Sequence, residues 1–322
     1  MNLLKTKEEF ILKILITGGA GFIGSHLAEY FTEQNNEVFV LDNLKTGYRS
    51  NVSFIDNAHF IKNDVTNKQF VTELINKEQF DYVIHLAAVV SVVESIENPI
   101  LSQTVNIEAT LNILESNRQY NKNLKKFIFA SSAAVYGNTE GLPKKLETFI
   151  DPESPYAIEK YAAEQYTKLY NKLYGIPTTS LRFFNIYGAR QDPSSPYSGV
   201  LSIMNEKFQN DETFTFFGDG EQTRDFVYVK DLVQAVSIIL NNESSNGKIY
   251  NLGNGNQISL LQIFNTFEKL YKKTINHRFS DPRSGDIKHS YAQIEELTSL
   301  GYEPKYSVED GLAAYVNYTN HL

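Results

Sequence analysis

Short, largely apolar runs alternate with longer amphipathic stretches over the first 185 residues of the chain. Such short continuous runs predict strands buried on both faces, as in a parallel sheet covered by helices. The runs are ILKILIT (11–17), EVFVLD (37–42), YVIHLAA (82–88), KFIFASS (126–132) and TTSLRFF (178–184). Between the first two, Ile23, Leu27 and Phe31 recur at helical spacing and predict a helix over residues 22–34. The alternation predicts an α/β fold built on a doubly wound parallel sheet.

The pattern loosens beyond residue 185, where the loops 188–199 and 217–225 separate shorter elements. We expect a smaller lobe of mixed α and β structure there, packed over the carboxyl edge of the sheet. Ligands of open α/β sheets bind at that edge. The expected division is a sheet domain over 11–185, rejoined by a returning segment near 225–253, and a second lobe over 186–224 and 254–322.

A helix is predicted over residues 155–174. Ser154 is a favourable N-cap, and the proline that follows it lacks an N–H that would be unpaired there anyway. Gly175 ends the helix. Tyr156 and Lys160 then lie one turn apart on the same face. By itself this spacing is more often a solvated pair than a functional one.

Composition narrows the possible partners and chemistry. The net charge of -8 and the pI near 5.4 argue against a nucleic-acid partner, which would need a basic face. The absence of cysteine excludes disulfides, thiolate metal sites and a cysteine nucleophile. The six histidines show no pair at metal-ligand spacing, so we expect no metal. Without a signal peptide or an apolar run of about 18 residues, we expect no membrane association and a cytoplasmic location.

The segment ITGGAGFIG (16–24) places Gly18, Gly21 and Gly24 between the first strand and the first helix. Glycines suit a tight turn whose backbone approaches a pyrophosphate and aims a helix N-terminus at it. A glycine triplet alone is a weak signal, but this one has the required strand before it and helix after it. The loop therefore predicts a dinucleotide cofactor.

Asp42 ends the second strand, 18 residues beyond Gly24. A carboxylate at this position can hold both ribose hydroxyls and would repel a 2′-phosphate, so it favours NAD over NADP. Lys45 and Arg49 follow closely, and either could reach a phosphate. The alternative of NADP therefore stays open.

Further motifs follow the glycine loop in order: Asp64-Val65, HLAA (85–88), Asn106, SSAAVYG (131–137), YAIEK (156–160) and LRFFNIYG (181–188). Over nearly its whole length the chain resembles the extended short-chain dehydrogenase/reductase family, and within it the UDP-hexose 4-epimerases. The resemblance implies an NAD-binding Rossmann-type domain and a nucleotide-sugar-binding lobe. Such isomerases oxidise C4 of a UDP-sugar with tightly held NAD, turn the 4-keto sugar over and return the hydride to its other face.

The family's catalytic positions fall on Ser132, Tyr156 and Lys160. Removing the C4 hydroxyl proton requires a base, and a free tyrosine has a pKa near 10, about three units too high. The charges of Lys160, of the helix N-terminus and of oxidised nicotinamide are expected to lower the pKa of Tyr156. Ser132 would hydrogen-bond the reacting oxygen, with Ser131 as the alternative if the strand register differs by one.

The resemblance assigns further residues to the cofactor and the substrate. Asp64 and Val65 should border the adenine, and Phe184 the nicotinamide. Arg224 and Arg283 match two arginines that grip the substrate diphosphate, whose oxygens suit guanidinium forks. The cofactor set is Gly18, Gly21, Phe22, Ile23, Gly24, Asp42, Asn43, Asp64, Val65, Leu86, Ala87, Ala88, Asn106, Tyr156, Lys160 and Phe184. The substrate set is Ser91, Ser132, Tyr156, Asn185, Gly199, Val200, Arg224, Arg283 and Ser290.

Sister reactions of the same family need other side chains. Nucleotide-sugar 4,6-dehydratases carry an Asp-Glu pair directly before VYG, and UDP-glucuronate decarboxylases carry a glutamate there, because they need additional acid–base groups. This chain has Ala133-Ala134, whose methyl groups cannot transfer protons. A hexuronate 4-epimerase stays open, because nothing in the sequence shows what occupies C6. The retained Tyr156 and Lys160 disfavour a non-catalytic NAD-binding module.

Ser290 lies seven residues beyond Arg283, at the position that faces the sugar's 2-substituent in similar epimerases. A small residue leaves room for an acetamido group, whereas a tyrosine would fill that space. We therefore expect UDP-GlcNAc and UDP-GalNAc as substrates, with UDP-glucose and UDP-galactose also accepted. The loop 191–199 resembles that of epimerases acting on N-acetylated sugars and is weaker evidence for the same substrates. The uridine nucleotide is implied by the resemblance only. If Tyr291 faced the sugar instead, the pocket would be closed.

Helices near 99–118 and 155–174 resemble the pair that family members pack across a twofold axis. The resemblance therefore implies a homodimer. The candidate contact residues on the outer side are Tyr161, Ala162, Gln165 and Leu169.

Overall fold

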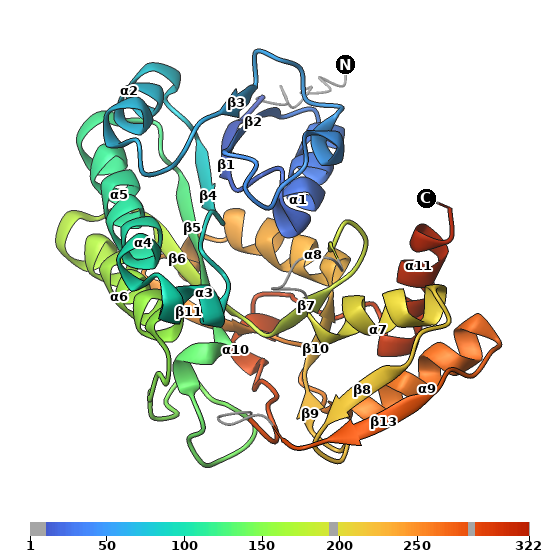
Figure 1. Cartoon of the computed structure of the whole chain (residues 1–322). Helices are drawn as coiled ribbons and strands as arrows, with labels where there is room; N and C mark the ends of the chain where they lie inside the picture. The colour runs from blue at the N-terminus through green and yellow to red at the C-terminus, as the bar shows by residue number, and fades with distance from the viewer. Residues whose placement is uncertain (1–10, 193–198, 283–286, 322) are drawn as a thin grey trace, which may run out of the picture.

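A seven-stranded parallel sheet forms the centre of the molecule (Figure 1). The computed structural model describes residues 11–192, 199–282 and 287–321. The strand order is β11-β6-β5-β4-β1-β2-β3, and each neighbouring pair is parallel. The strands are β1 (Lys13–Thr17), β2 (Glu37–Asp42), β3 (Phe60–Lys62), β4 (Tyr82–His85), β5 (Lys126–Ser132), β6 (Thr178–Phe183) and β11 (Lys248–Leu252). This sheet confirms the predicted Rossmann-type fold.

The strand order reverses between β1 and β4. From β1 the chain adds β2 and β3 on one side, and it then returns to place β4, β5 and β6 on the other. Loops that follow β1 and β4 consequently diverge at the carboxyl edge of the sheet. In open α/β sheets this point of reversal is where ligands bind.

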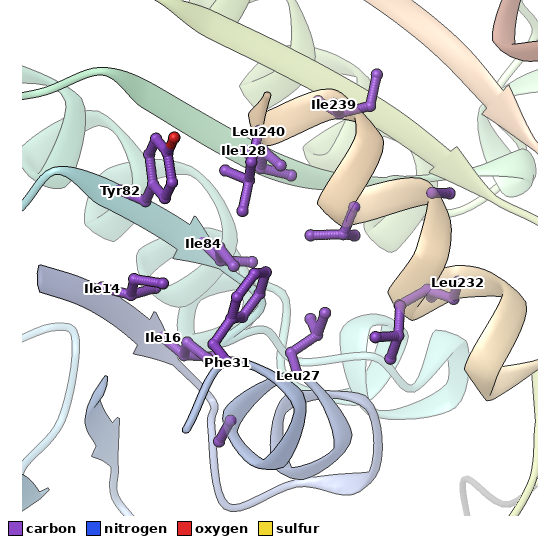
Figure 2. Close-up of a cluster of buried hydrophobic side chains, with 14 of the residues drawn as sticks. Ile14, Ile16, Leu27, Phe31, Tyr82, Ile84, Ile128, Leu232, Ile239 and Leu240 are labelled. Carbon is purple, nitrogen blue, oxygen red and sulfur yellow. The ribbon is translucent and has the colours of Figure 1, made fainter. Parts of the chain in front are cut away.

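Successive residues of β1 serve opposite faces of the sheet, because side chains alternate along a strand. Ile14 and Ile16 join the core shared with α1 (Phe22–Glu33) and α8 (Val229–Leu240), which Figure 2 shows. Leu15 joins the core on the other face. The helices of that face are α2 (Lys68–Glu78), α5 (Ala109–Tyr120) and α6 (Pro155–Tyr174). Burial on both faces explains why the strands are continuous apolar runs.

Short helical segments connect the main elements. Helices α3 (Val92–Glu97) and α4 (Pro99–Gln103) pack beside α6 and lead through a π-helical turn, η2 (Thr104–Glu108), into α5. The 3-10 turns are η1 (Arg49–Val52), η3 (Ala133–Tyr136) and η4 (Glu243–Ser245).

Helix α6 begins and ends where the sequence predicts. The Ser154 hydroxyl accepts a hydrogen bond from the Ala157 N–H at 3.2 Å, as an N-cap does. Gly175 adopts a φ of +70° and ends the helix in the left-handed conformation. These caps fix Tyr156 in the first turn of α6 and Lys160 in the second.

The second lobe contains three small two-stranded sheets and four helices among the described residues (Figure 1). Its strand pairs are β7 (Asn185–Tyr187) with β10 (Phe226–Tyr228), β8 (Phe214–Phe217) with β13 (His277–Ser280), and β9 (Thr223–Arg224) with β12 (Ile258–Ser259). Its helices are α7 (Val200–Gln209), α9 (Leu260–Tyr271), α10 (Glu295–Thr298) and α11 (Val308–Thr319). A separate apolar core, rich in phenylalanine and tyrosine, joins most of these elements.

The chain returns to the first domain within residues 225–253, where α8 packs on α1 and β11 pairs with β6. On this basis we propose the division into a sheet domain over 11–185 with this returning segment, and a lobe over 186–224 and 254–322. Of the helices in the described parts of the chain, none is long and apolar enough to cross a bilayer.

Candidate active site

A cavity of about 440 Å³ follows the carboxyl ends of the central strands. Its wall contains every residue predicted to bind the cofactor except Asn106. These are Gly18, Gly21, Phe22, Ile23, Gly24, Asp42, Asn43, Asp64, Val65, Leu86, Ala87, Ala88, Tyr156, Lys160 and Phe184. Ser132 and its alternative Ser131 line the same cavity. The fold thus brings the glycine loop and the predicted catalytic residues to one place.

The glycine loop is packed too tightly for larger residues. Gly18 has a φ of +68°, and a Cβ added to it would lie 2.9 Å from the Ala87 nitrogen. A Cβ on Gly24 would lie 2.3 Å from the Gly18 carbonyl oxygen. No side chain caps the start of α1, so the N–H groups of its first turn, at Phe22 and Ile23, are available at the cavity. This cradle fits the diphosphate of a dinucleotide.

Asp42 joins the end of β2 to the glycine loop. Its carboxylate accepts hydrogen bonds from the Ala20 N–H at 2.9 Å and the Leu44 N–H at 2.8 Å. Burial raises the pKa of Asp42, and the backbone donors partly oppose that effect. The carboxylate is therefore oriented at the cavity wall, in the position required to accept ribose hydroxyls.

The two cations near Asp42 are both engaged elsewhere. Arg49 donates to the carbonyls of Val52 and Ile55 at 2.5 and 2.6 Å. Lys45 forms an ion pair with Glu94 of α3. The preference for NAD over NADP therefore rests on Asp42, whose carboxylate at the cavity wall would repel a 2′-phosphate.

Lys160 lies 4 % exposed beneath the cavity. Its ammonium donates to the Ala130 carbonyl at 2.9 Å and lies 5.9 Å from the centre of the Tyr156 ring. Burial lowers the pKa of Lys160 to about 8, while the charge of Glu159 acts in the opposite direction. The residue thus retains its charge over most of the neutral range.

Contacts at both its backbone and its hydroxyl fix the position of Tyr156. Its N–H donates to the Ser95 hydroxyl at 3.2 Å, and its side chain hydrogen-bonds Ser132. Burial raises the pKa of Tyr156, the Ser132 hydrogen bond lowers it, and the Glu159 charge raises it. The net rise differs from the expected lowering, because the Lys160 ammonium is directed to a carbonyl and burial dominates.

The hydrogen bonds of Ser131 and Ser132 distinguish the two candidates. Ser131 donates to the buried carboxylate of Glu164 at 2.7 Å, and Glu164 also pairs with Arg182 at 2.8 Å. Ser132 instead accepts from the Ala134 N–H at 3.2 Å and contacts Tyr156. Ser132 is therefore the serine whose hydroxyl is placed beside the tyrosine.

Asn106 lies behind the cavity wall. Its side chain accepts from the Val89 N–H at 2.9 Å and donates to the Val89 carbonyl at 3.0 Å. It also donates to Glu159 at 2.7 Å. Asn106 therefore holds the backbone of Val89 by two hydrogen bonds. Val89 lines the cavity, whereas Asn106, unlike the other predicted cofactor residues, does not.

Sequence reasoning missed two residues beside the catalytic candidates, Glu159 and Ser95. Helical spacing puts position 159 on the same side of α6 as Tyr156, so the periodicity of the helix contained the signal. Ser95 comes from α3, 61 residues before the tyrosine whose N–H it accepts. No local pattern could have identified it.

Most of the predicted substrate residues lie outside the wall of this cavity. Asn185 begins β7 beside Asp225, and Gly199 and Val200 begin α7. Ser91 caps α3 by accepting from the Glu94 N–H at 3.0 Å. Arg224 donates to the carbonyl of Thr223 at 2.9 Å. Arg283 is outside the described residues.

Ser290 and Tyr291 lie in an extended segment between two neighbours. The Ser290 N–H donates to the Thr223 carbonyl at 3.2 Å, and the Tyr291 carbonyl accepts from the Lys144 N–H at 2.8 Å. Successive side chains of an extended segment point to opposite sides. Tyr291 lines a separate hollow with Tyr306, which leaves Ser290 on the other side.

Comparisons with known proteins match nearly the whole chain. A family model described as "NAD dependent epimerase/dehydratase family" matches residues 14–253. A putative UDP-glucose 4-epimerase from Methanocaldococcus jannaschii is 41% identical over 310 residues, covering 95% of this chain and 97% of the relative. A solved UDP-N-acetylglucosamine 4-epimerase from Methanobrevibacter ruminantium, in complex with UDP-N-acetylmuramic acid, is 33% identical with a TM-score of 0.90, covering 97% and 99%. A solved UDP-glucuronic acid 4-epimerase from Bacillus cereus, in complex with UDP-glucuronic acid and NAD, is 31% identical with a TM-score of 0.85, covering 96% and 99%.

Proposed function

The chain belongs to the NAD-dependent epimerase/dehydratase family, and from this premise we propose that it interconverts UDP-GlcNAc and UDP-GalNAc, and UDP-glucose and UDP-galactose as well. Its activity class is that of an NAD-dependent UDP-sugar 4-epimerase. The observation that carries the proposal is that Ser132, Tyr156 and Lys160 share one cavity with the glycine loop and Asp42.

In the proposed reaction the chain's own residues handle the proton of the C4 hydroxyl. The glycine loop and Asp42 would hold NAD, which would supply a hydride acceptor for the oxidation of C4 and a hydride donor for its reduction. Tyr156 removes the hydroxyl proton and gives it back, and Ser132 hydrogen-bonds the same oxygen. Lys160, anchored to the Ala130 carbonyl, keeps a positive charge near the phenol. Because Tyr156 and Lys160 share the first two turns of α6, their separation is fixed by the helix.

The residues after Ser132 favour epimerisation over the sister reactions. Ala133 and Ala134 form the start of η3, directly after the strand that ends in Ser132. Dehydration and decarboxylation need additional acid–base groups in this region, and alanine side chains supply none. We therefore propose neither reaction for this chain.

The proposal of N-acetylated sugars rests on Ser290. Tyr291, the residue that would close the sugar pocket, lines a hollow with Tyr306 and Asn256. Ser290, on the opposite side of the same segment, is small enough to leave space for an acetamido group. UDP-hexuronates are the second candidate class, because one solved relative acts on UDP-glucuronic acid.

We also propose that the protein is a homodimer through α4 and α6. Ile100 of α4 is 76 % exposed, and Leu173 of α6 is 57 % exposed. Ile158 and Leu169 add to the exposed apolar side of α6, and α4 packs beside that helix. Contiguous exposed apolar side chains of this kind are typical of a protein contact.

A substrate panel tests the proposed reaction. The protein is supplied with UDP-GlcNAc, UDP-glucose and UDP-glucuronate in parallel, and products are followed by NMR. We expect UDP-GalNAc and UDP-galactose to form and UDP-glucuronate to remain unchanged. Parallel GDP- and dTDP-sugars test the nucleotide. Turnover of UDP-glucuronate alone would replace the proposal with the hexuronate reaction.

A further inference from the structure

Glu159 is a buried carboxylate in the middle of the catalytic stretch of α6. Its side chain is 4 % exposed, and it accepts hydrogen bonds from the Ser102 hydroxyl at 2.5 Å and the Asn106 amide at 2.7 Å. Within the described parts of the chain it forms no ion pair with a lysine or arginine. Burying a carboxylate without a paired cation is unfavourable, so a compensating charge is expected close by.

Lys160, the next residue, is a buried cation that likewise has no charged partner among the described side chains. Lys160 is also 4 % exposed, and its ammonium hydrogen-bonds the neutral carbonyl of Ala130. Over the residues that the structure describes, it too has no carboxylate within ion-pair distance. Two opposite buried charges therefore stand on consecutive residues, each held by neutral partners. Among the described groups, Glu159 is the one whose charge acts to raise the pKa of Lys160.

The other charged groups on elements around α6 are compensated or solvated. Arg182 of β6 pairs with Glu164, and burial lowers the pKa of His85 on β4 to about 3, so that His85 is neutral near pH 7. Three of the remaining groups form ion pairs: Glu94 of α3 with Lys45, Glu108 of η2 with Lys68, and Glu115 of α5 with Arg118. Glu97 of α3 is exposed to solvent. Lys126 of β5 donates to the Asn242 carbonyl, and the Tyr136 hydroxyl of η3 accepts from Arg182. None of these groups supplies a counter-charge to Lys160 in place of Glu159.

We propose that Glu159 is a positioning residue whose negative charge, fixed by Ser102 and Asn106, keeps Lys160 charged beneath Tyr156. The proposal rests on the proposed roles of Tyr156 and Lys160. Asn106 also clamps Val89 of the cavity wall, so the carboxylate is tied to the site rather than free to turn away. The geometry agrees with the electrostatic directions, since the Glu159 charge raises the pKa of Lys160 and also that of Tyr156.

The sign of the effect follows from the active protonation state, which has Tyr156 ionised and Lys160 protonated. The two limbs of the pH–rate profile therefore report the pKa values of Tyr156 and Lys160. Glu159→Gln removes the charge that raises both pKa values. Both limbs of the pH–rate profile should therefore move to lower pH, by about 0.5 to 1 unit. A residue with only a structural role would lower the plateau and leave both limbs in place.

The test compares pH–rate profiles of the parent, Glu159→Gln and Ser102→Ala. Ser102→Ala is the matched control, because it removes one donor and keeps the carboxylate charge. A second measurement needs no turnover: the tyrosinate absorbance that is lost in Tyr156→Phe is titrated in the presence of NAD. Failure of the substrate proposal would leave this titration unaffected, so the two proposals fail separately.

We expect Glu159→Gln to move both limbs and the tyrosinate pKa to lower pH, and Ser102→Ala, which keeps the charge and the Asn106 donor, to shift them less. Limbs that stay in place in Glu159→Gln would overturn the proposal, as would an equal shift in Ser102→Ala. Should Glu159→Gln not fold, Glu159→Ala carries the same expectation. A chain that folds only with a carboxylate at position 159 would make the residue structural, which also overturns the proposal.

Discussion

Tyr156→Phe removes one hydroxyl and leaves the ring and helix α6 in place. We expect epimerase turnover to fall by about 100-fold or more, the contribution typical of a general base. Bound NAD should be retained, because the cofactor cavity keeps its shape. Turnover is measured by NMR, and NAD is measured in the denatured protein. Tyr161→Phe, on the same helix, is the control, and parental turnover in Tyr156→Phe would remove Tyr156 as the base.

Ser290→Tyr tests the proposed choice of sugar. The added ring should exclude the acetamido group and lower UDP-GalNAc turnover roughly tenfold or more, while UDP-galactose turnover is retained. The ratio of the two rates is the measurement. Tyr291→Phe, which alters the opposite side of the segment, should leave that ratio unchanged. Equal UDP-GalNAc rates in the parent and Ser290→Tyr would exclude Ser290 as the determinant.

Single residues were predictable where their signal is local. Gly18 and Asp42 follow from the strand and helix on either side, and both line the cavity. Ser91 caps α3 within a local Ser-x-x-Glu pattern, whereas Asn106 depends on a partner that the sequence does not specify, the Val89 backbone. The raised pKa of Tyr156 has the same origin, because burial depends on the whole site.

At the scale of the element, Gly175 determines where α6 ends. Its φ of +70° is a conformation that other residues adopt with strain, although no atom lies within 4 Å of an added Cβ. We expect Gly175→Ala to lower the free energy of unfolding by about 1 kcal/mol through backbone strain alone. Denaturant unfolding is the measurement, and Lys172→Ala in the same last turn is the control. An unchanged midpoint would contradict the assigned role of this glycine.

The long elements were predictable and the short ones were not. Residues 155–174 carry an N-cap, a helical period and a terminal glycine, and α6 has these bounds. The three residues of β3 provide too few positions for a strand pattern. Strand β3 forms by pairing with β2 at the edge of the sheet. Helix α2 carries Phe70, Val71, Leu74 and Ile75 at helical spacing, so its apolar period is present in the sequence although no helix was predicted there.

At the scale of the whole molecule, we expect a dimer in light scattering at micromolar concentration. Ile100→Asp should shift the population to monomer, because it places a charge in the proposed apolar contact. Ile11→Asp is the control, since Ile11 is 68 % exposed just before β1 and lies outside the two helices of the proposed contact. A monomeric parent protein would contradict the proposed assembly.

The pairing of β11 with β6 has a consequence for the order in which the protein is made. During synthesis β6 is complete once residue 183 has been added. Strand β11, its neighbour in the sheet, begins only at residue 248, after much of the second lobe and α8 have been synthesised. Until then the nascent sheet ends in a strand with unpaired N–H and C=O groups. A chain arrested in this interval would offer that strand to neighbouring molecules, so the vulnerable period of biosynthesis lies between these two residues.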